Sequence, residues 1–222
     1  LGINRLSIGV QSFDDEKLKF LTRTHSAEQS LRAIDHACGA GFENIGLDLI
    51  YGLPGEAVAG WQKDLDQAMA FDPAHLSCYL LSIEPGTAFS ARVASKTLQP
   101  ADPDSQAALF LHTVSFLSAK RYLPYEVSNF ARGNDCRSRH NSGYWQNRPY
   151  IGLGASAHSF DGRQRSWNHA DVQAYIHGTG RGRQPVSDSE ILTVEQQMIE
   201  AVMLGLRTRE GICINDFNER FS

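Results

Sequence analysis

Apolar residues alternate with small or polar ones in three segments of the first half of the chain, which predicts three β-strands. These segments are residues 6–11, 45–52 and 76–84. Between them, apolar residues recur at helical spacing, and helix signals flank each stretch. A capping box at residues 26–29 opens the first helix, Asp72-Pro73 ends the second, and Asp102-Pro103 opens a third. The third helix is expected to bury a stripe that includes Phe110, Leu111 and Leu117.

The order of these elements predicts an α/β fold. Strands that alternate with helices are usually parallel and joined by right-handed crossovers, which gives an open or closed barrel or a doubly wound sheet. A further strand is predicted over residues 125–130, and residues 131–161 are expected to be mostly irregular. A helix is predicted over residues 187–206, and residues 211–222 are expected to begin a small helical domain.

Two polar residues stand out within the predicted strands. Alternation places Gln11 on one strand face with Gly9, and Asp48 on one face with Gly46. A packed barrel interior would carry bulky branched side chains at such positions, so the pattern predicts a hollow for water or a ligand. Folds with parallel strands bind ligands near the C-terminal strand ends. In the alternative interpretation, Gln11 and Asp48 cap neighbouring helices or bind backbone.

Composition narrows the classes of partner. The chain has 222 residues, of which 41% are hydrophobic and 21% charged, as expected of a globular protein with one substantial core. Its net charge of −4 gives no general attraction to nucleic acid or anionic membranes, so a small or medium ligand is expected. No apolar run is long enough to span a bilayer, which predicts a cytoplasmic protein. The four scattered cysteines predict reduced, buried thiols.

Four segments resemble those of the radical S-adenosylmethionine proteins of the oxygen-independent coproporphyrinogen oxidase type. They are SIGVQSF at residues 7–13, DLIYGLPG at 48–55, IEPGT at 83–87 and EVSNF at 126–130. Their order and spacing match that family over nearly the whole chain. The resemblance implies that residues 1–130 form the C-terminal part of a partial (β/α) barrel of the radical SAM type. Residues 131–222 would then form a mixed irregular and helical C-terminal region.

The resemblance also implies a cofactor site, with Gln11, Arg23 and Asp48 around S-adenosylmethionine. A carboxylate and an amide can bind ribose hydroxyls or an ammonium group, and an arginine can hold a carboxylate. Without the resemblance, Arg23 is interpreted as a solvated charge at a helix end. Members of the family hold a 4Fe-4S cluster on a CxxxCxxC loop, and this motif is missing here. Since a cluster needs gathered thiolates, it is expected in the full-length protein only, and the chain alone should be inactive.

A second motif, HNxxYW at residues 140–145, resembles the haem-binding signature of the chaperone branch of this family. Imidazole is a natural axial ligand of haem iron, so His140 is the candidate ligand. Tyr144 and Trp145 would stack on or flank the macrocycle. In the alternative interpretation, His140 is a loop histidine fixed by its neighbours and the aromatic rings belong to the core. Ser138 stands where many relatives have a cysteine, so thiol ligation is not expected.

Residues 152–157 fit a GxGxxA dinucleotide pattern. The pattern lacks the preceding strand, the following helix and the later acidic residue that would confirm a nucleotide site, so this interpretation is rejected. In the resemblance the segment is a loop that closes over the barrel mouth. His158 would then face the cofactor, although a structural histidine is an equally good interpretation.

Three functions follow from these patterns. The resemblance implies a protein of haem and porphyrin metabolism, and the HNxxYW motif favours a chaperone that binds haem and delivers it to an acceptor protein. The alternative is an oxygen-independent coproporphyrinogen III oxidase (dehydrogenase), for which a porphyrinogen is the substrate. A third hypothesis, made without the resemblance, is a barrel enzyme for a small polar metabolite with residues 152–157 as its phosphate loop. The start at Leu1, without an initiator methionine, predicts a piece of a longer protein.

Overall fold

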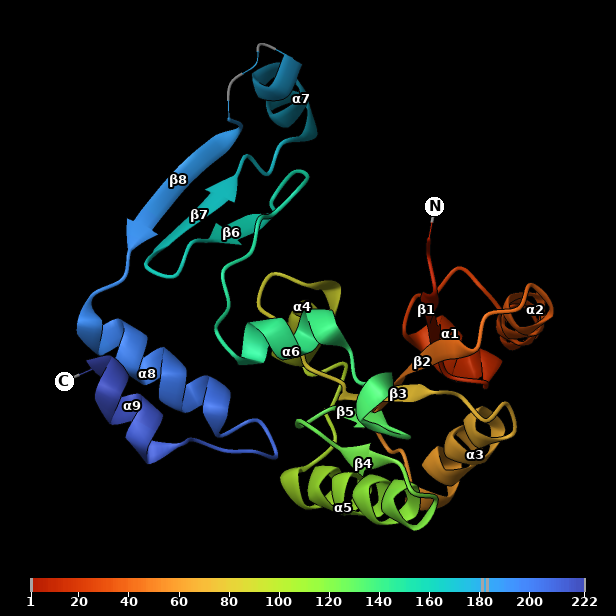
Figure 1. Cartoon of the computed structure of the whole chain (residues 1–222). Coiled ribbons are helices and arrows are strands. Elements are labelled where there is room, and N and C mark those ends of the chain that lie inside the picture. The colour runs from red at the N-terminus through yellow and green to blue at the C-terminus, as the bar shows by residue number, and fades with distance from the viewer. Residues whose placement is uncertain (1, 181, 183, 222) are drawn as a thin grey trace. The chain divides into compact units, whose positions relative to one another are not determined.

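The computed structural model describes residues 2–180, 182 and 184–221 of the chain (Figure 1). These residues belong to two units, Leu1–Arg137 and Ser138–Ser222, and each unit is described by itself. The division into domains at residue 130, expected from the resemblance, stays a prediction.

Strands and helices alternate in the first unit. Its strands are β1 (Arg5–Gln11), β2 (Asn44–Tyr51), β3 (His75–Leu80), β4 (Leu123–Pro124) and β5 (Asn129–Ala131). Its helices are α1 (Asp15–Phe20), α2 (Ala27–Gly39), α3 (Val58–Met69), α4 (Ala88–Ala94) and α5 (Pro103–Ala119), with a 3-10 turn at Asn134–Cys136. The first two predicted strands and the three predicted helices are confirmed, whereas α1 and α4 were not predicted.

The five strands of this unit form one sheet in the order β1-β2-β3-β5-β4. The pairs β1–β2 and β2–β3 are parallel, as predicted, and the described strands do not close into a barrel. The strand predicted over residues 125–130 is wrong in its bounds, since β5 begins at Asn129 and runs antiparallel to both β3 and β4. Only four residues separate β4 from β5, which is too few for the crossover that a parallel pair needs.

The hydrophobic core lies between one face of the sheet and helices α2, α3 and α5. Val10, Leu47 and Leu76 of the three parallel strands are fully buried there, together with Trp61 of α3. The stripe expected on α5 is partly wrong. Leu117 is buried, but Phe110 and Leu111 are exposed, because the helix turns Leu109, Thr113 and Leu117 toward the sheet.

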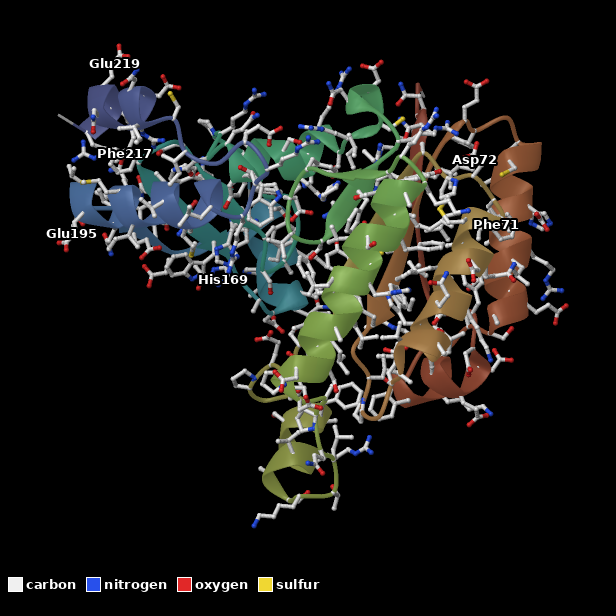
Figure 2. The ribbon with its side chains drawn as sticks, turned by 90° about the horizontal axis from the view of Figure 1, so that it is seen from below. Phe71, Asp72, His169, Glu195, Phe217 and Glu219 are labelled. Atoms are coloured by element: carbon white, nitrogen blue, oxygen red, sulfur yellow. The ribbon has the colours of Figure 1, made fainter. Side chains whose placement is uncertain are left out.

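The second unit combines short helices with a small antiparallel sheet. Its elements are α6 (Arg139–Trp145), β6 (His158–Phe160), β7 (Gln164–Asn168), α7 (Val172–Gly180), β8 (Val186–Ile191), α8 (Val194–Gly205) and α9 (Ile214–Phe221). The sheet has the order β6-β7-β8, and α9, which carries Phe217, lies beside α8 (Figure 2). The helix predicted over residues 187–206 is wrong in its first third, which is β8. The expectation of irregular structure over residues 131–161 is wrong at α6 and β6.

Candidate functional site

Gln11 and Asp48 lie on the same face of the sheet, the face opposite the core helices. The Ser7 hydroxyl of β1 donates to both carboxylate oxygens of Asp48 on β2, at 3.1 Å each. The Gln11 side chain folds back over Gly9, since a Cβ added at Gly9 would lie 2.7 Å from Gln11 Nε2. Ser7 and Gly9 share a strand face, so Gln11 and Asp48 border one surface of small and polar groups.

A row of polar side chains crosses the sheet on this face. Asp48 pairs with Ser77 of β3, and Ser77 pairs with Asn129 of β5. With Ser7, these three residues are called the polar row. Ser77 and Asn129 are each 3% exposed. In the neighbouring pair, Gly46 leaves space for His75, because a Cβ at Gly46 would lie only 3.3 Å from His75 Nδ1.

Three buried polar atoms of the first unit have no hydrogen-bond partner in the described part of the chain. They are His75 Nδ1, Glu126 Oε1 and Asn129 Oδ1. His75 Nε2 lies 2.8 Å from the Tyr125 hydroxyl. Burial, with a smaller contribution from the Arg5 guanidinium, lowers the pKa of His75 to about 3, so the ring is neutral at pH 7. Buried polar groups are normally satisfied, so the unsatisfied atoms of His75 and Asn129 mark the face as a candidate ligand site.

The sequence analysis missed three residues of this face, namely His75, Ser77 and Asn129. A usable signal existed for one of them, since Asn129 belongs to the EVSNF segment that carries the resemblance. The types of residue on this face are suited to binding S-adenosylmethionine. The face offers hydrogen-bond acceptors for hydroxyl and ammonium groups, and glycines leave space beside them.

Arg23 follows helix α1, and its backbone N–H donates to the carbonyl of Leu18 at 2.9 Å. Its side chain is exposed. Both interpretations of Arg23, as a cofactor contact and as a solvated charge at a helix end, are compatible with this position, so its role stays a prediction.

The HNxxYW motif forms helix α6, where the sequence analysis expected a loop. Ser138 caps the helix by accepting from the Asn141 N–H at 3.2 Å. His140 and Tyr144, one turn apart, are both exposed, and their rings meet edge to face at 4.7 Å between centroids. Tyr144 in turn meets Tyr150 at 4.7 Å. Trp145 is half-buried and lies about 100° further around the helix than Tyr144, so the helix groups His140 with Tyr144 but not with Trp145.

The glycine-rich segment at residues 152–157 is a loop tied to its own unit. The side-chain amide of Asn168 donates to the carbonyls of Gly152 and Gly154, at 3.3 and 2.9 Å. Strand β6 follows the glycines where a dinucleotide fold would have a helix, which agrees with the rejection of a nucleotide site. His158 of β6 is exposed and stacks on Trp167, with 5.7 Å between ring centroids. Its predicted role toward the cofactor is not decided by this position.

The four cysteines are free, as expected, but the expectation that they are buried is wrong for three of them. Cys78 is buried, Cys136 is half-buried, and Cys38 and Cys213 are exposed. Within the described ranges, His, Cys, Asp and Glu side chains form no group of three or more that could hold a metal ion. The described residues therefore do not fit an iron–sulfur cluster.

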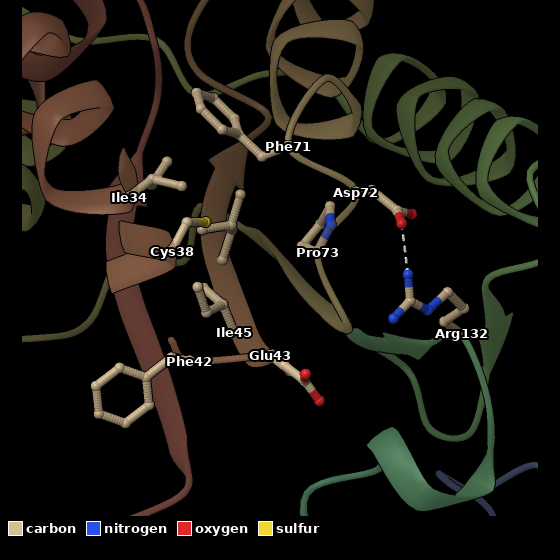
Figure 3. Close-up of a pocket in the computed structure, with 10 residues that line it drawn as sticks. Ile34, Cys38, Phe42, Glu43, Ile45, Phe71, Asp72, Pro73 and Arg132 are labelled. Carbon is tan, nitrogen blue, oxygen red and sulfur yellow. Dashed lines mark hydrogen bonds and ion pairs between the residues drawn. The ribbon is translucent and has the colours of Figure 1, made fainter. Parts of the chain in front are cut away.

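A pocket of about 250 Å³ lies at the N-terminal ends of the parallel strands (Figure 3). Ile45 at the start of β2 and Pro73 just before β3 line it, and the ion pair between Arg132 and Asp72, 2.5 Å long, borders it. Both residues thus lie where a parallel strand begins. Parallel α/β folds bind ligands at the C-terminal ends, so the pocket is not the candidate site.

Comparisons with known proteins agree with these features. The model of the Radical SAM superfamily matches residues 1–68, and that of the HemN C-terminal domain matches residues 192–222. The heme chaperone HemW of Bacillus subtilis is 35% identical over 99% of this chain and 58% of its own length. HemW of Escherichia coli is 42% identical over 71% of this chain and 40% of its own length. The chain thus spans about half the length of the curated relatives it matches.

Among solved structures, coproporphyrinogen III oxidase (HemN) from Escherichia coli, described as a radical SAM enzyme, is similar with a TM-score of 0.76. The match covers 99% of this chain and 53% of that protein, at 21% sequence identity, and shows a shared fold.

The chain therefore carries regions that match the Radical SAM superfamily and the HemN C-terminal domain, and S-adenosylmethionine and a 4Fe-4S cluster are the cofactors that this superfamily implies. The curated relatives include HemW heme chaperones and the fold is that of HemN, which agrees with the predicted family. The hypothesis of a generic barrel enzyme is set aside. Among the described residues, no helix is long and apolar enough to cross a membrane. The cytoplasmic location stays a prediction.

Proposed function

We propose that the full-length protein is a haem chaperone, which binds haem through His140 and delivers it to an acceptor protein. The observation that carries this proposal is the exposed His140 imidazole, set against the Tyr144 ring on α6 within the HNxxYW motif. An exposed imidazole is free to coordinate haem iron. The ring contacts from His140 through Tyr144 to Tyr150 add aromatic surface on which the flat macrocycle can pack. The similarity to HemW heme chaperones supports the same function.

Hemin titration of the full-length protein tests this proposal. We expect His140→Ala to weaken hemin binding at least about tenfold and to change the Soret band, because the iron loses its axial ligand. His177→Ala is the matched control, since His177 is an exposed histidine on α7 of the same unit. Identical Soret spectra for the wild type and His140→Ala would remove His140 as the ligand. Trp145→Ala tests the remaining predicted contact, which lies on another side of α6.

We further propose that Gln11, Arg23 and Asp48 hold S-adenosylmethionine, as the resemblance implies. The Asp48 carboxylate would accept from ribose hydroxyls, the Gln11 amide would bind beside it, and Arg23 would pair with the carboxylate of the methionyl group. When bound beside the cluster, S-adenosylmethionine supplies the adenosyl chemistry of the superfamily. The cluster is expected only in the full-length protein. His158 stays a weaker predicted contact.

Oxygen-independent coproporphyrinogen III oxidase is the second candidate function. The fold shared with HemN favours it. Under this hypothesis the protein is an oxidoreductase and binds a porphyrinogen rather than haem. Assaying the full-length, cluster-reconstituted protein for conversion of coproporphyrinogen III to protoporphyrinogen IX separates the two functions. Robust turnover would replace the chaperone proposal, whereas hemin binding without turnover would support it.

A further inference from the structure

One half-buried lysine and two buried carboxylates join the loops that follow β1 and β2. Lys17 Nζ of α1 lies 2.5 Å from Glu56 Oε1 and 2.7 Å from Asp64 Oδ2. Both carboxylates are 3% exposed, and the lysine side chain is 17% exposed. Burial by itself lowers the pKa of Lys17, but the hydrogen bonds and charges of the two carboxylates more than offset it, so this pKa is raised. Lys17 therefore remains charged. These three residues are called the Lys17 network.

Asp64 fixes the chain directly after Gln11. Its carboxylate accepts from the Phe13 N–H at 2.7 Å and from the Ser12 hydroxyl at 2.9 and 3.0 Å. Gln11 itself has a φ of 66°, in the left-handed region that side-chain-bearing residues rarely adopt. The Ser12 N–H donates to the Val10 carbonyl at 2.8 Å, which closes a tight turn around Gln11. The bonds to Asp64 hold this unfavourable turn in place.

Glu56 fixes the chain directly after β2. Its second carboxylate oxygen accepts from the Gly52 N–H at 2.7 Å and the Leu53 N–H at 3.2 Å. Gly52 also has a left-handed backbone, with a φ of 80°, and it follows the strand that carries Asp48. Because Lys17 belongs to α1, the helix that leads to Arg23, the network reaches all three segments that carry the predicted S-adenosylmethionine contacts.

The bonding pattern indicates that the network does more than stabilise the core. A buried ion pair is often replaceable by packed apolar side chains without loss of stability. Here, however, the carboxylates accept from three backbone N–H groups and one hydroxyl, all at the ends of strands that border the polar row. Groups that orient a ligand-binding side chain commonly act through such outer hydrogen bonds.

We propose that the Lys17 network is a positioning device for S-adenosylmethionine, in which Asp64 and Ser12 hold Gln11 in its binding conformation. The inference rests on the proposed contact of Gln11 with that ligand. Ser12 and Asp64 are positioning residues and do not touch the ligand.

The test measures the affinity of the full-length, cluster-loaded protein for S-adenosylmethionine by calorimetry, alongside its stability in urea. Ser12→Ala removes the hydroxyl but leaves every charge of the network in place, and its stability in urea shows what the loss of the hydroxyl costs the fold. Asp64→Asn keeps the shape and removes the charge. We expect each to weaken binding about 10- to 100-fold, as changes in outer hydrogen-bond partners commonly do.

Two controls separate positioning from stability. Lys19→Met changes the other lysine of α1, whose partner Glu16 is exposed, and should leave the affinity unchanged. Thr113→Val removes the buried hydroxyl of α5 that accepts from Trp61 Nε1 at 2.7 Å and leaves every residue of the Lys17 network in place. It should lower stability without changing the affinity for S-adenosylmethionine.

The outcomes distinguish this inference from the proposed function. If the wild type does not bind S-adenosylmethionine, or Gln11→Ala binds it equally well, the proposed contact is wrong and the inference is overturned with it. If Gln11→Ala loses binding but Ser12→Ala and Asp64→Asn bind like the wild type, only the inference is overturned. The inference is also overturned if the affinity falls in proportion to stability in every variant, Thr113→Val included.

Discussion

His75 should make the stability of the first unit depend on pH. Its side chain is 2% exposed, and its Nε2 lies 2.8 Å from the Tyr125 hydroxyl. Burial, assisted by the positive charge of Arg5, lowers the pKa of His75 to about 3 in the folded state. In the unfolded chain a histidine has a pKa of about 6.5. Between these two values the unfolded chain binds a proton that the folded protein does not.

The sign and size of the effect follow from this difference. A depressed pKa means that the stability is complete above about pH 6.5 and falls as the pH drops toward 3. The slope is about 1.4 kcal/mol per pH unit for one proton. A fall from pH 6.5 to pH 5 therefore lowers the free energy of unfolding by about 2 kcal/mol through His75 alone.

Urea unfolding of the full-length protein at pH 7, 6 and 5 measures this dependence. The comparison is with His75→Gln, which keeps a side-chain amide within reach of Tyr125 but does not titrate. We expect the wild type to lose about 2 kcal/mol more than the variant between pH 7 and pH 5. Equal losses for the two proteins would refute the reasoning, because His75 would then take up no proton on unfolding.

Two further predictions concern the stability of the first unit. Gly52→Ala should destabilise the protein by about 1–3 kcal/mol in urea unfolding. A φ of 80° is unfavourable for alanine, and the added Cβ would also meet the Leu80 side chain. Gly60→Ala is the control and should be neutral or stabilising, because a Cβ there would point into open space on α3. Trp61→Phe and Thr113→Val each break the same buried hydrogen bond. Their double variant should therefore cost about 1 kcal/mol less than the sum of the single losses, and simple additivity would contradict this coupling.

In the first unit, the strands and helices were predicted correctly where the pattern of buried residues and the local capping signals indicate the same element. Strand β2 reads clearly from sequence because its alternating residues, such as Leu47 and Leu49, are all buried on one face. Helix α2 begins where its Ser26 capping box predicts. Strand β3 was predicted too long, since the apolar character continues past Leu80, although Tyr79 and Leu80 are already exposed.

The second unit was harder to predict because its elements bury little. Every residue of β8 is exposed, so no apolar alternation distinguishes it from the helix that follows. Helix α6 contains Asn141 and Gly143, which are poor helix formers, and its start depends on the Ser138 cap. In both segments, contacts within the unit and capping decide the structure rather than hydrophobic periodicity.

Only part of the candidate site could be predicted from the sequence. Gln11 and Asp48 were predicted to border one site because alternation places each on the strand face of a glycine two residues earlier. Ser77 and Asn129 join them only through the register of β3 with β2 and of β5 with β3, which local patterns do not specify. The Lys17 network likewise depends on three segments that meet only in the folded chain.

The polar face of the sheet and the Lys17 network differ in how well their polar atoms are hydrogen-bonded. Each buried polar atom left without a partner costs about 1–3 kcal/mol, so His75 Nδ1, Glu126 Oε1 and Asn129 Oδ1 together weigh heavily against a net stability of about 5–15 kcal/mol. The acceptors of the Lys17 network, in contrast, are matched with donors from the loops. Satisfied groups thus fix the strand ends, while His75 and Asn129, each with an unsatisfied atom, lie on the face that those ends border. This is the distribution expected of a rigid support around a surface that is completed only by what it binds.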